Sequence, residues 1–495
     1  MTELVVGHIK YVVSIFLCIL SCVSCQQRLP DAQDKHTLPE LFPDYTEVTI
    51  PPNIAPLNFQ LRDPAEAIAV FSHRQEQLQV KAKQGVFTIP YKPWKKLLER
   101  VAGDSITVTI YAKDSSQWYK YLPYPIYVSA NLIDSWLVYR RIAPGYRMWS
   151  EMGIYQRCLE DFTEEAILEN KQTNNSCINC HSFCMNNSQQ MLFHQRANYA
   201  GTYLVSNNTV EKLNPEQTTD KKISSLVYPY WHPLGNYIAF STNDTKQDFH
   251  LSDPNRIEVF DNHSDIVLYD LKKNELFSDP VLASDSSLEI YPAFSPDGRQ
   301  LYFCSAVSQS MPELYREMKY SLVRTIFNPE DRSFGKVDTL YNAKEEGRSA
   351  KFPRISPDGN YLLYTLSDYG NFSIWHKDAD LRMINLRTLE TDSLPDVNSG
   401  DVESYHSWSS NSRWFVFSSR RMDGLYTRPY ICYIDKHGKT GKPFVLPQKN
   451  TDYYTHSLFS FNIPELIKER VGISPYDLLQ YILKQNVTPL QQEAQ

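Results

Sequence analysis

Residues 291–303 read Tyr-Pro-Ala-Phe-Ser-Pro-Asp-Gly-Arg-Gln-Leu-Tyr-Phe, and this stretch decides the fold because it recurs along the chain. A strand enters, a tight Asp-Gly turn reverses it, and an apolar strand returns, which is the pattern of a β-hairpin. Three further copies begin at Tyr228, Phe352 and Tyr405. A second pair of strands follows each copy, so the repeating unit has four strands, as in one blade of a β-propeller.

The copies at 291–303 and 352–364 both contain Ser-Pro-Asp-Gly, and in this they resemble the tandem repeats of TolB-like β-propellers. The resemblance covers about residues 180 to 460, because the motif returns at the same place in successive units. The last copy departs from it and reads Ser-Ser-Asn-Ser at 409–412. A degenerate blade over 136–168 would bring the number of blades to six, and residues 456–461 would return to close the ring.

Alternating segments between residues 46 and 130, interrupted by a short helix at 94–100, predict a small β-sandwich. The 33 Tyr and 30 Pro suit short strands joined by turns. We therefore expect an all-β protein with short C-terminal helices, the latter at 465–470 and 476–483. The expected units are an export signal (1–25), a tether (26–45), the β-sandwich (46–130), the propeller (131–462) and a helical tail (463–495).

The first 25 residues predict export. Lys10 precedes the apolar run 11–20, which is too short to cross a membrane comfortably and is followed by small residues and cysteines. This end is similar to the lipobox of bacterial lipoproteins, with Cys25 or Cys22 as the lipidated residue. We expect a lipid-anchored protein of a bacterial cell envelope, in the periplasm or at the outer membrane. A plain cleaved signal or an uncleaved anchor is the alternative.

Cys177, Cys180 and His181 form the C-x-x-C-H pattern that attaches a c-type haem. Two thiols at this spacing add to the two vinyl groups of the porphyrin, and the adjacent imidazole reaches the iron. An export signal in the same chain favours this interpretation, because c-type haem is attached after export. The alternatives are a zinc site that also uses Cys184 and His194, and a disulfide within the motif or between Cys184 and Cys158.

A second axial ligand is expected if the haem transfers electrons. His194 is the preferred candidate because the repeat places it where other blades have Ser241, Cys304, Thr365 and Ser418, a position that tolerates a polar group. Met191 is the second candidate, although it aligns with apolar core residues. The two side chains point to opposite faces of one strand, so only one of them can serve. An open iron position is the remaining alternative.

The repeats also predict a channel site. His181, His406 and His456 each precede a serine at the start of a blade, where other blades carry proline. Residues at blade entry surround the central channel, so these histidines would face a shared cavity. Arg354, Arg420 and Arg421 lie near equivalent strand ends and would recognise haem propionates or another anion. Alternatively, the histidines satisfy backbone groups at the blade edges.

The overall charge excludes one class of function. With 50 Lys and Arg against 57 Asp and Glu, the net charge of −7 offers no basic field for nucleic acid. The chain contains no G-x-S-x-G, H-E-x-x-H or Walker motif, so it carries no hydrolase or transferase signature and is at most a haem-dependent oxidoreductase. The expected function is electron transfer or redox sensing with an envelope or redox protein partner. The alternative is a haem-independent binding module.

Overall fold

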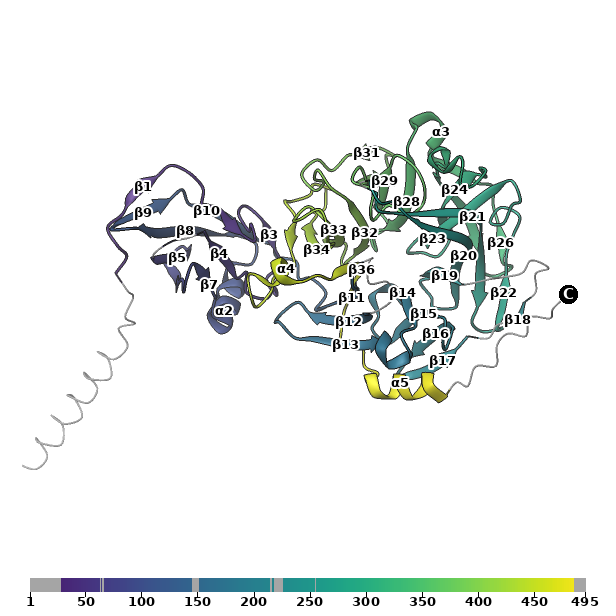
Figure 1. The fold of residues 1–495 in the computed structure, drawn as a ribbon, viewed down its shortest axis with the longest axis horizontal. Coiled ribbons are helices and arrows are strands. Elements are labelled where there is room, and N and C mark those ends of the chain that lie inside the picture. The colour runs from purple at the N-terminus through teal and green to yellow at the C-terminus, as the bar shows by residue number, and fades with distance from the viewer. Residues whose placement is uncertain are drawn as a thin grey trace, which may run out of the picture.

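The computed structural model describes residues 28–62, 64, 66–144, 151–213, 216–217, 226–253 and 255–484. The export signal and the candidate lipidation sites Cys22 and Cys25 lie outside these residues. A small N-terminal domain stands beside a ring of sheets, and the chain passes once from the first to the second (Figure 1). Among the described helices, none is both long and apolar enough to span a bilayer.

The N-terminal domain consists of two sheets and one helix. The larger sheet has the order β1-β9-β8-β10-β3 with β5 and β6 attached, and the smaller has the order β2-β4-β7. Helix α2 (Tyr91–Val101) and the small sheet cover the same face of the large sheet, because Phe71 contacts both Phe59 and Trp94. The strands are β1 (Gln33–Lys35), β2 (Leu41–Phe42), β3 (Thr49–Ile50), β4 (Phe59–Leu61), β5 (Glu66–His73), β6 (Glu76–Lys81), β7 (Val86–Phe87), β8 (Ser105–Asp114), β9 (Gln117–Tyr121) and β10 (Tyr124–Val128).

The sandwich therefore begins earlier than its sequence pattern suggests. Strands β1 and β2 lie within 26–45, which we expected to be a tether, and β1 pairs in parallel with β9. The domain also rests on the last blade of the propeller, because the Trp414 indole donates to the Leu132 carbonyl at 3.1 Å and Asn58 donates to the Lys449 carbonyl at 3.0 Å. These bonds fix the domain to the rim of the ring.

The propeller has six blades, which confirms the predicted fold. Each blade is one sheet whose innermost strand lines the central channel, and the pairing within the blades is antiparallel except between β18 and β22. The first blade combines the last strand of the chain, β36 (Ser460–Ile467), with β11 (Trp136–Ile142), β12 (Met152–Cys158) and β13 (Glu164–Glu169). The second and third blades are β14 (Cys177–Phe183), β15 (Gln190–Arg196), β16 (Gly201–Ser206) and β17 (Thr209–Lys212), and then β19 (Val227–Trp231), β20 (Tyr237–Phe249), β21 (Ile257–Asp270) and β22 (Glu275–Phe277) with β18 (Glu216–Gln217). The fourth to sixth blades are β23 (Ser287–Phe294), β24 (Gln300–Val307), β25 (Ser321–Asn328), β26 (Ser333–Phe334) and β27 (Asp338–Tyr341); β28 (Ser349–Ile355), β29 (Tyr361–Ser367), β30 (Asp380–Asn385) and β31 (Thr391–Asp392); and β32 (Glu403–Trp408), β33 (Trp414–Ser419), β34 (Arg428–Tyr433) and β35 (Phe444–Val445).

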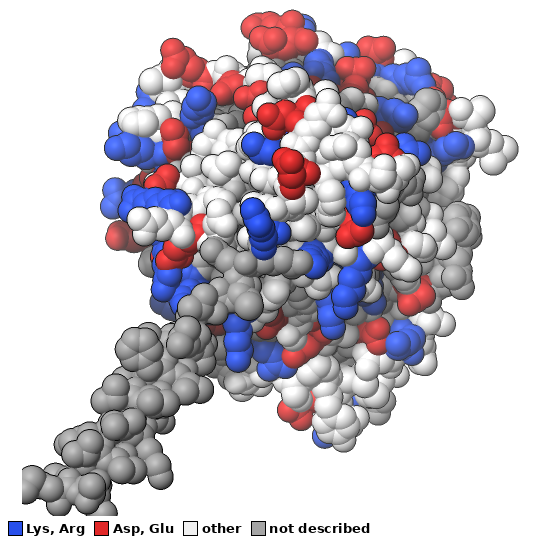
Figure 2. Space-filling view, turned by 90° about the vertical axis from the view of Figure 1, so that its left-hand side faces the viewer, with Lys and Arg blue, Asp and Glu red and all other residues white. Residues whose placement is uncertain are grey.

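Short helices connect or cover the blades. They are α3 (Ala343–Glu346), α4 (Tyr453–His456), α5 (Pro475–Lys484) and the 3-10 turns η2 (Asn170–Thr173), η3 (Cys184–Asn186) and η4 (Tyr315–Glu317). Helix α5 confirms the second predicted C-terminal helix and buries Leu478 and Ile482 beside the second blade. On the face drawn in Figure 2, acidic and basic side chains are interspersed, without a broad field of one sign.

The ring is closed by its last strand. The predicted helix over 465–470 is wrong, because Glu465 and Leu466 belong to β36, which pairs with β11. Leu466 and Ile467 read as one apolar face of a helix, but pairing with a strand more than 300 residues earlier buries them in the ring instead. The closing segment is also displaced from 456–461 to Ser460–Ile467.

Each innermost strand carries one residue with left-handed backbone at the same level of the ring. They are Cys180 (φ 53°), Tyr228 (48°), Tyr291 (60°), Phe352 (52°), Tyr405 (48°) and Ile463 (52°). The strand register shifts at this residue in every blade, which is the geometry of a β-bulge. Four of the side chains are aromatic and pack in series, with ring centroids 4.7, 4.2 and 4.9 Å apart. We call Tyr228, Tyr291, Phe352 and Tyr405 the aromatic plug.

The closing strand gives a direct test of the fold. A chain that ends at Phe459 lacks β36 and leaves the edge of β11 unpaired, so we expect it to lose the cooperative thermal transition and to be cleaved rapidly by protease. A chain that ends at Lys484 keeps every described strand and should melt like the full protein. Circular dichroism and limited proteolysis measure both variants, and equal stability of the two would contradict the closure.

Candidate functional site

The central channel holds two cavities on opposite sides of the aromatic plug. The larger has a volume of about 330 Å³, and we call it the arm cavity because a long hairpin covers it. The smaller has a volume of about 100 Å³, and we call it the turn cavity because Pro296 and Pro357 of the two Ser-Pro-Asp-Gly turns border it. Tyr405 and Ile463 contact both cavities, so the plug is the partition between them.

Both thiols of the C-x-x-C-H motif face the arm cavity. Cys177 and Cys180 line it together with Asn179, whose amide lies 3.5 Å from the Cys177 sulfur. Residues three apart on a regular strand face opposite sides, but the bulge at Cys180 turns its side chain to the side of Cys177. Burial raises the pKa of Cys177 to about 11 and also raises that of Cys180, so both are protonated thiols at neutral pH.

His181 points to the other side of the strand, away from the arm cavity. Both of its ring nitrogens are buried and make no hydrogen bond of normal geometry, although the carbonyls of Ile463 and Val138 lie nearby. Burial, with a smaller effect from the charge of Arg140, lowers the pKa of His181 to about 3, so its ring is neutral. The imidazole therefore packs between blades and borders the turn cavity.

His406 occupies the equivalent position and shows what this site does in the fold. Its Nε2 lies 2.9 Å from the Leu363 carbonyl on the preceding blade and donates to it. Leu363 lies opposite Arg354 in the fifth blade, and Val138 lies opposite Glu465 at the equivalent position of the first blade. His181 therefore faces Val138 on its preceding blade as His406 faces Leu363. The alternative interpretation of these histidines, that they satisfy backbone groups between blades, is the one that the geometry of His406 supports.

The two candidate axial ligands do not face the thiols. The register places His194 opposite Asn179 and Cys304 opposite Ile290, so the repeat alignment of His194 was correct. However, the His194 Nδ1 lies 3.1 Å from the Thr202 hydroxyl, and its side chain does not line the arm cavity. Burial lowers its pKa to about 4. Met191 is fully buried in the core between blades, as expected of an apolar repeat position.

His456 is not a channel residue, which corrects the prediction. It ends helix α4 with 75% of its side chain exposed, and its Nδ1 lies 3.0 Å from the Asp452 carbonyl. Pro464, which follows the left-handed Ile463, takes the blade-entry position in that strand. The prediction compared His456-Ser457 with His181-Ser182 and His406-Ser407. The register of the closing strand depends instead on the bulge at Ile463, which precedes Pro464.

The three predicted arginines separate. Arg420 lines the arm cavity, where it is buried against the Trp375 ring at 3.2 Å from the centroid. Burial lowers its pKa to about 9, and its Nε makes no hydrogen bond. Arg354 lines the turn cavity instead. Arg421 lines neither cavity, because it forms an ion pair with the buried Glu403 at 2.8 Å.

Sequence reasoning missed two further cations of the arm cavity. Arg140 on β11 and Arg196 at the end of β15 line it together with Arg420. The Arg140 Nε is buried without a hydrogen-bond partner. The structure places Arg140 opposite Asn462 at the same level of its blade as His194 opposite Asn179, a correspondence that only the strand register shows. Three guanidinium groups around one cavity make it a site for an anion.

A long hairpin covers the arm cavity. Strands β20 and β21 continue past the blade into an arm over 243–263. Thr245, Gln247 and Phe249 on one strand, and Ile257 and Val259 on the other, line the cavity. The arm is therefore part of the wall of the site.

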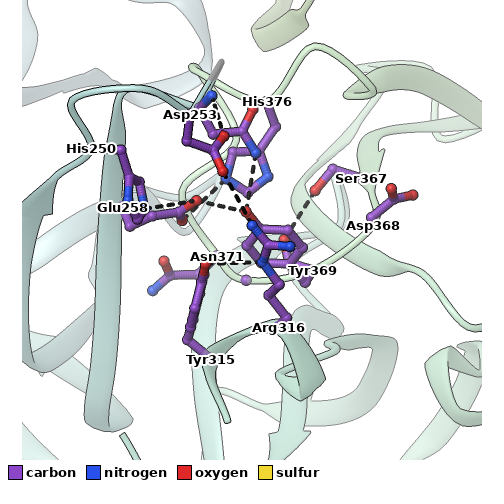
Figure 3. Close-up of polar contacts among 12 residues, drawn as sticks. His250, Asp253, Glu258, Tyr315, Arg316, Ser367, Asp368, Tyr369, Asn371 and His376 are labelled. Carbon is purple, nitrogen blue, oxygen red and sulfur yellow. Dashed lines mark hydrogen bonds and ion pairs between the residues drawn. The ribbon is translucent and has the colours of Figure 1, made fainter. Parts of the chain in front are cut away.

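Buried polar contacts hold the arm to the fourth and fifth blades (Figure 3). The Glu258 carboxylate accepts from the Tyr369 hydroxyl at 2.6 Å and lies 3.3 Å from the Nε2 of His376. Further out, Arg316 pairs with Asp253 at 3.2 Å. Because Glu258 is almost fully buried, its contacts with Tyr369 and His376 fix the arm more firmly than a surface ion pair would.

A second buried carboxylate anchors the base of the arm. Asp261 accepts hydrogen bonds from the Tyr320 hydroxyl and the Asn371 amide, each at 3.0 Å. Burial raises the pKa of Asp261 to about 6, although these hydrogen bonds oppose the shift. The base of the arm thus contains a carboxyl group that changes charge slightly below neutral pH.

Comparisons with known proteins do not assign the chain to a family. No protein-family model matches the chain, and no curated protein matches it. Similar solved structures include an oligogalacturonate lyase from Vibrio parahaemolyticus (13% identity, 59% of this chain and 71% of that chain, TM-score 0.35) and a putative 6-phosphogluconolactonase from Bacteroides uniformis (11%, 78% and 98%, 0.34). The β-propeller domain of the trilobed protease from Pyrococcus furiosus is a third (10%, 67% and 79%, 0.32). With TM-scores below 0.5 these likenesses carry no argument about activity, and the propeller is established by its six sheets.

The anchor of the arm predicts a local effect of one substitution. Glu258→Ala removes the acceptor for Tyr369, and a hydrogen bond to a charged group contributes about 1.5–3 kcal/mol. We expect the backbone amides of 243–263 to exchange with deuterium at least tenfold faster, with little change elsewhere. Glu313→Ala, at an exposed position in the neighbouring loop, is the matched control. Unchanged exchange in the arm of Glu258→Ala would refute the anchor.

Asp261 predicts how stability depends on pH. Its folded pKa of about 6 lies above the ordinary value of 3.8, so the folded protein binds this proton more tightly than the unfolded chain does. The associated stability is present below pH 4 and is lost as the pH rises through 6, by on the order of 3 kcal/mol. Asp261→Asn cannot ionise and should lack this loss. Melting temperatures from pH 4 to 8 measure it, and parallel profiles for the two proteins would contradict it.

Proposed function

We propose that this chain is an exported β-propeller protein that holds one covalently attached haem c in the arm cavity and acts in electron transfer or redox sensing. The observation that carries the proposal is that the Cys177 and Cys180 thiols face the same cavity. A strand without the bulge would have turned one of them away. When bound, a haem supplies one-electron redox chemistry that no side chain of the cavity provides.

The cavity wall supports the same ligand class. A haem is flat and apolar with two carboxylates at one edge. Tyr228, Tyr405 and Trp375 offer ring faces to such a ligand, and Arg140 and Arg420 offer buried cationic groups whose Nε atoms have no partner. The arm adds Phe249, Ile257 and Val259 to the opposite wall, and apolar side chains there favour a large apolar ligand.

The state of the thiols suggests when attachment takes place. In the attachment reaction each S–H adds across a vinyl C=C bond, with sulfur bound to one carbon and hydrogen to the other, so no further reactant is consumed. The thiolate is the reactive form, and the raised pKa values of Cys177 and Cys180 keep it scarce in the folded protein. The scarcity of thiolate in the folded protein favours attachment before the second blade is closed.

His181 does not fit the role of axial ligand in this structure. Its ring lies on the face of β14 opposite the arm cavity and packs between two blades as His406 does. Neither His194 nor Met191 lines the cavity. The thiol pair thus fits covalent attachment, whereas the imidazole does not fit iron ligation.

The cellular setting forms part of the proposal. The apolar run 11–20 and the cysteines that follow it support export and a lipid anchor at Cys25 or Cys22 in a bacterial cell envelope. A redox or envelope protein would then be the partner, reached from the periplasm or at the outer membrane. Acidic and basic side chains are interspersed on the face drawn in Figure 2, so this face offers no basic field that would attract nucleic acid.

A single preparation tests the haem. The full chain is expressed together with a haem-attachment system, purified, denatured and analysed by mass spectrometry and absorbance. We expect one haem mass to remain on the peptide that contains Cys177 and Cys180. The double variant Cys177→Ala/Cys180→Ala should carry no haem and still show the β-propeller spectrum in circular dichroism.

The matched control replaces thiols that do not face the cavity. Cys304 and Cys432 are buried in apolar strands, so Cys304→Ala/Cys432→Ala should retain the full haem mass. A colourless wild-type protein, or equal haem content in the two double variants, would overturn the proposal.

A haem-independent binding module is the second candidate. The buried Arg420 stacks on Trp375, its Nε has no hydrogen-bond partner, and it lines a cavity that Arg140 and Arg196 also line. This arrangement suits any flat anionic ligand and does not require the thiols. A colourless protein that binds such an anion, with loss of binding in Arg420→Gln, would favour this candidate over the first.

A further inference from the structure

The turn cavity is a second site, separated from the arm cavity by the aromatic plug. Half of its polar lining comes from one level of the ring, two residues after each left-handed position, and His181, His406 and Asn186 add to it. Five of the six residues at this level are polar, and they come from five different blades: Ser182, Tyr230, Arg354, Ser407 and Glu465. A ring of mixed hydroxyl, guanidinium and carboxyl groups at a channel end is typical of a binding site for a small polar molecule.

Two opposite charges face this cavity without pairing. Arg354 and Glu465 form no ion pair with each other or with any other residue in the described part of the chain. The Arg354 guanidinium donates to the adjacent Pro353 carbonyl at 3.0 Å and lies over the Tyr230 ring, 5.0 Å from its centroid. The Glu465 carboxylate accepts only from the Phe183 backbone amide, at 3.1 Å.

Burial makes this arrangement unfavourable when the cavity holds only water. It lowers the pKa of Arg354 and raises that of Glu465 to about 7, so the charged form of each group is penalised. A buried charge is normally retained where a partner compensates it. The charges of Arg354 and Glu465 partly oppose these pKa shifts, but no direct ion pair joins the two groups, and a ligand that bonds to both would supply the missing contacts.

We propose that the turn cavity binds a small zwitterion of amino-acid size, with its carboxylate at Arg354 and its ammonium group at Glu465. A lone anion would leave Glu465 uncompensated, and a lone cation would leave Arg354 uncompensated. A ligand with both charges satisfies both groups at once. The Ser182 and Ser407 hydroxyls, on the two blades adjacent to that of Glu465, complete the polar lining.

The volume limits the ligand to the smallest amino acids. A cavity of about 100 Å³ accepts roughly seven water-sized groups, which matches glycine or alanine and excludes a large side chain. Trp231, Phe294 and Trp408 contribute apolar parts of the wall.

This inference does not depend on the haem, because the plug separates the two cavities. The test therefore uses the full chain as the Cys177→Ala/Cys180→Ala variant, which carries no haem whatever the outcome for the arm cavity. Isothermal titration calorimetry is performed with glycine, with N-acetylglycine, which lacks the ammonium charge, and with glycinamide, which lacks the carboxylate. We expect glycine to bind at least tenfold more tightly than either blocked analogue, and phenylalanine not to bind.

Two substitutions assign the charges. Glu465→Gln keeps an acceptor for the Phe183 amide and should weaken glycine binding at least tenfold, as should Arg354→Gln. Arg299→Gln, at an exposed position of a Ser-Pro-Asp-Gly turn, should bind glycine like the parent. Absence of glycine binding, equal affinity for glycine and N-acetylglycine, or unchanged affinity in Glu465→Gln would each overturn the proposal. The comparison of analogues on the parent decides the question even if a variant fails to fold.

Discussion

The left-handed residue in each innermost strand is the constraint on which the other features of the channel depend. Such backbone costs roughly 1–2 kcal/mol for a residue with a side chain, and the chain adopts it once in every blade. Because the residue bulges, its side chain turns toward the axis and the next residue turns between blades. The aromatic plug, the direction of Cys180 and the inter-blade position of His181 all follow from this geometry.

The parts of the fold that sequence predicts are those encoded locally. Each Ser-Pro-Asp-Gly turn fixes its own hairpin: the Ser356 hydroxyl donates to Asp358 at 2.7 Å, so these aspartates are turn residues as expected. The closing strand was misassigned because only its pairing with β11 defines it, and that partner lies more than 300 residues away. The early start of the sandwich was missed for the same reason, since β1 is short, exposed and defined by β9.

The candidate site was likewise predicted only in the part that one segment of the sequence encodes. The motif located the two thiols, but its usual reading assumes that the adjacent histidine shares their side of the backbone. On a bulged strand the histidine does not, so His181 and the thiols serve different surfaces. The cations of the arm cavity come from three blades, and no pattern in one segment indicates that Arg140, Arg196 and Arg420 converge. His194 was aligned correctly, yet alignment alone does not show where a side chain points.

The aromatic plug makes the channel impassable. Its rings lie 4.2–4.9 Å apart in series, so solutes on one face of the propeller have no axial route to the other. The channel thus contains two cavities on opposite sides of the aromatic plug. The arm covers one of them, and tight turns border the other. Tyr405 belongs to both, so a ligand that tilts its ring on one side alters the shape of the other. Communication between the two faces would then be mechanical rather than diffusive.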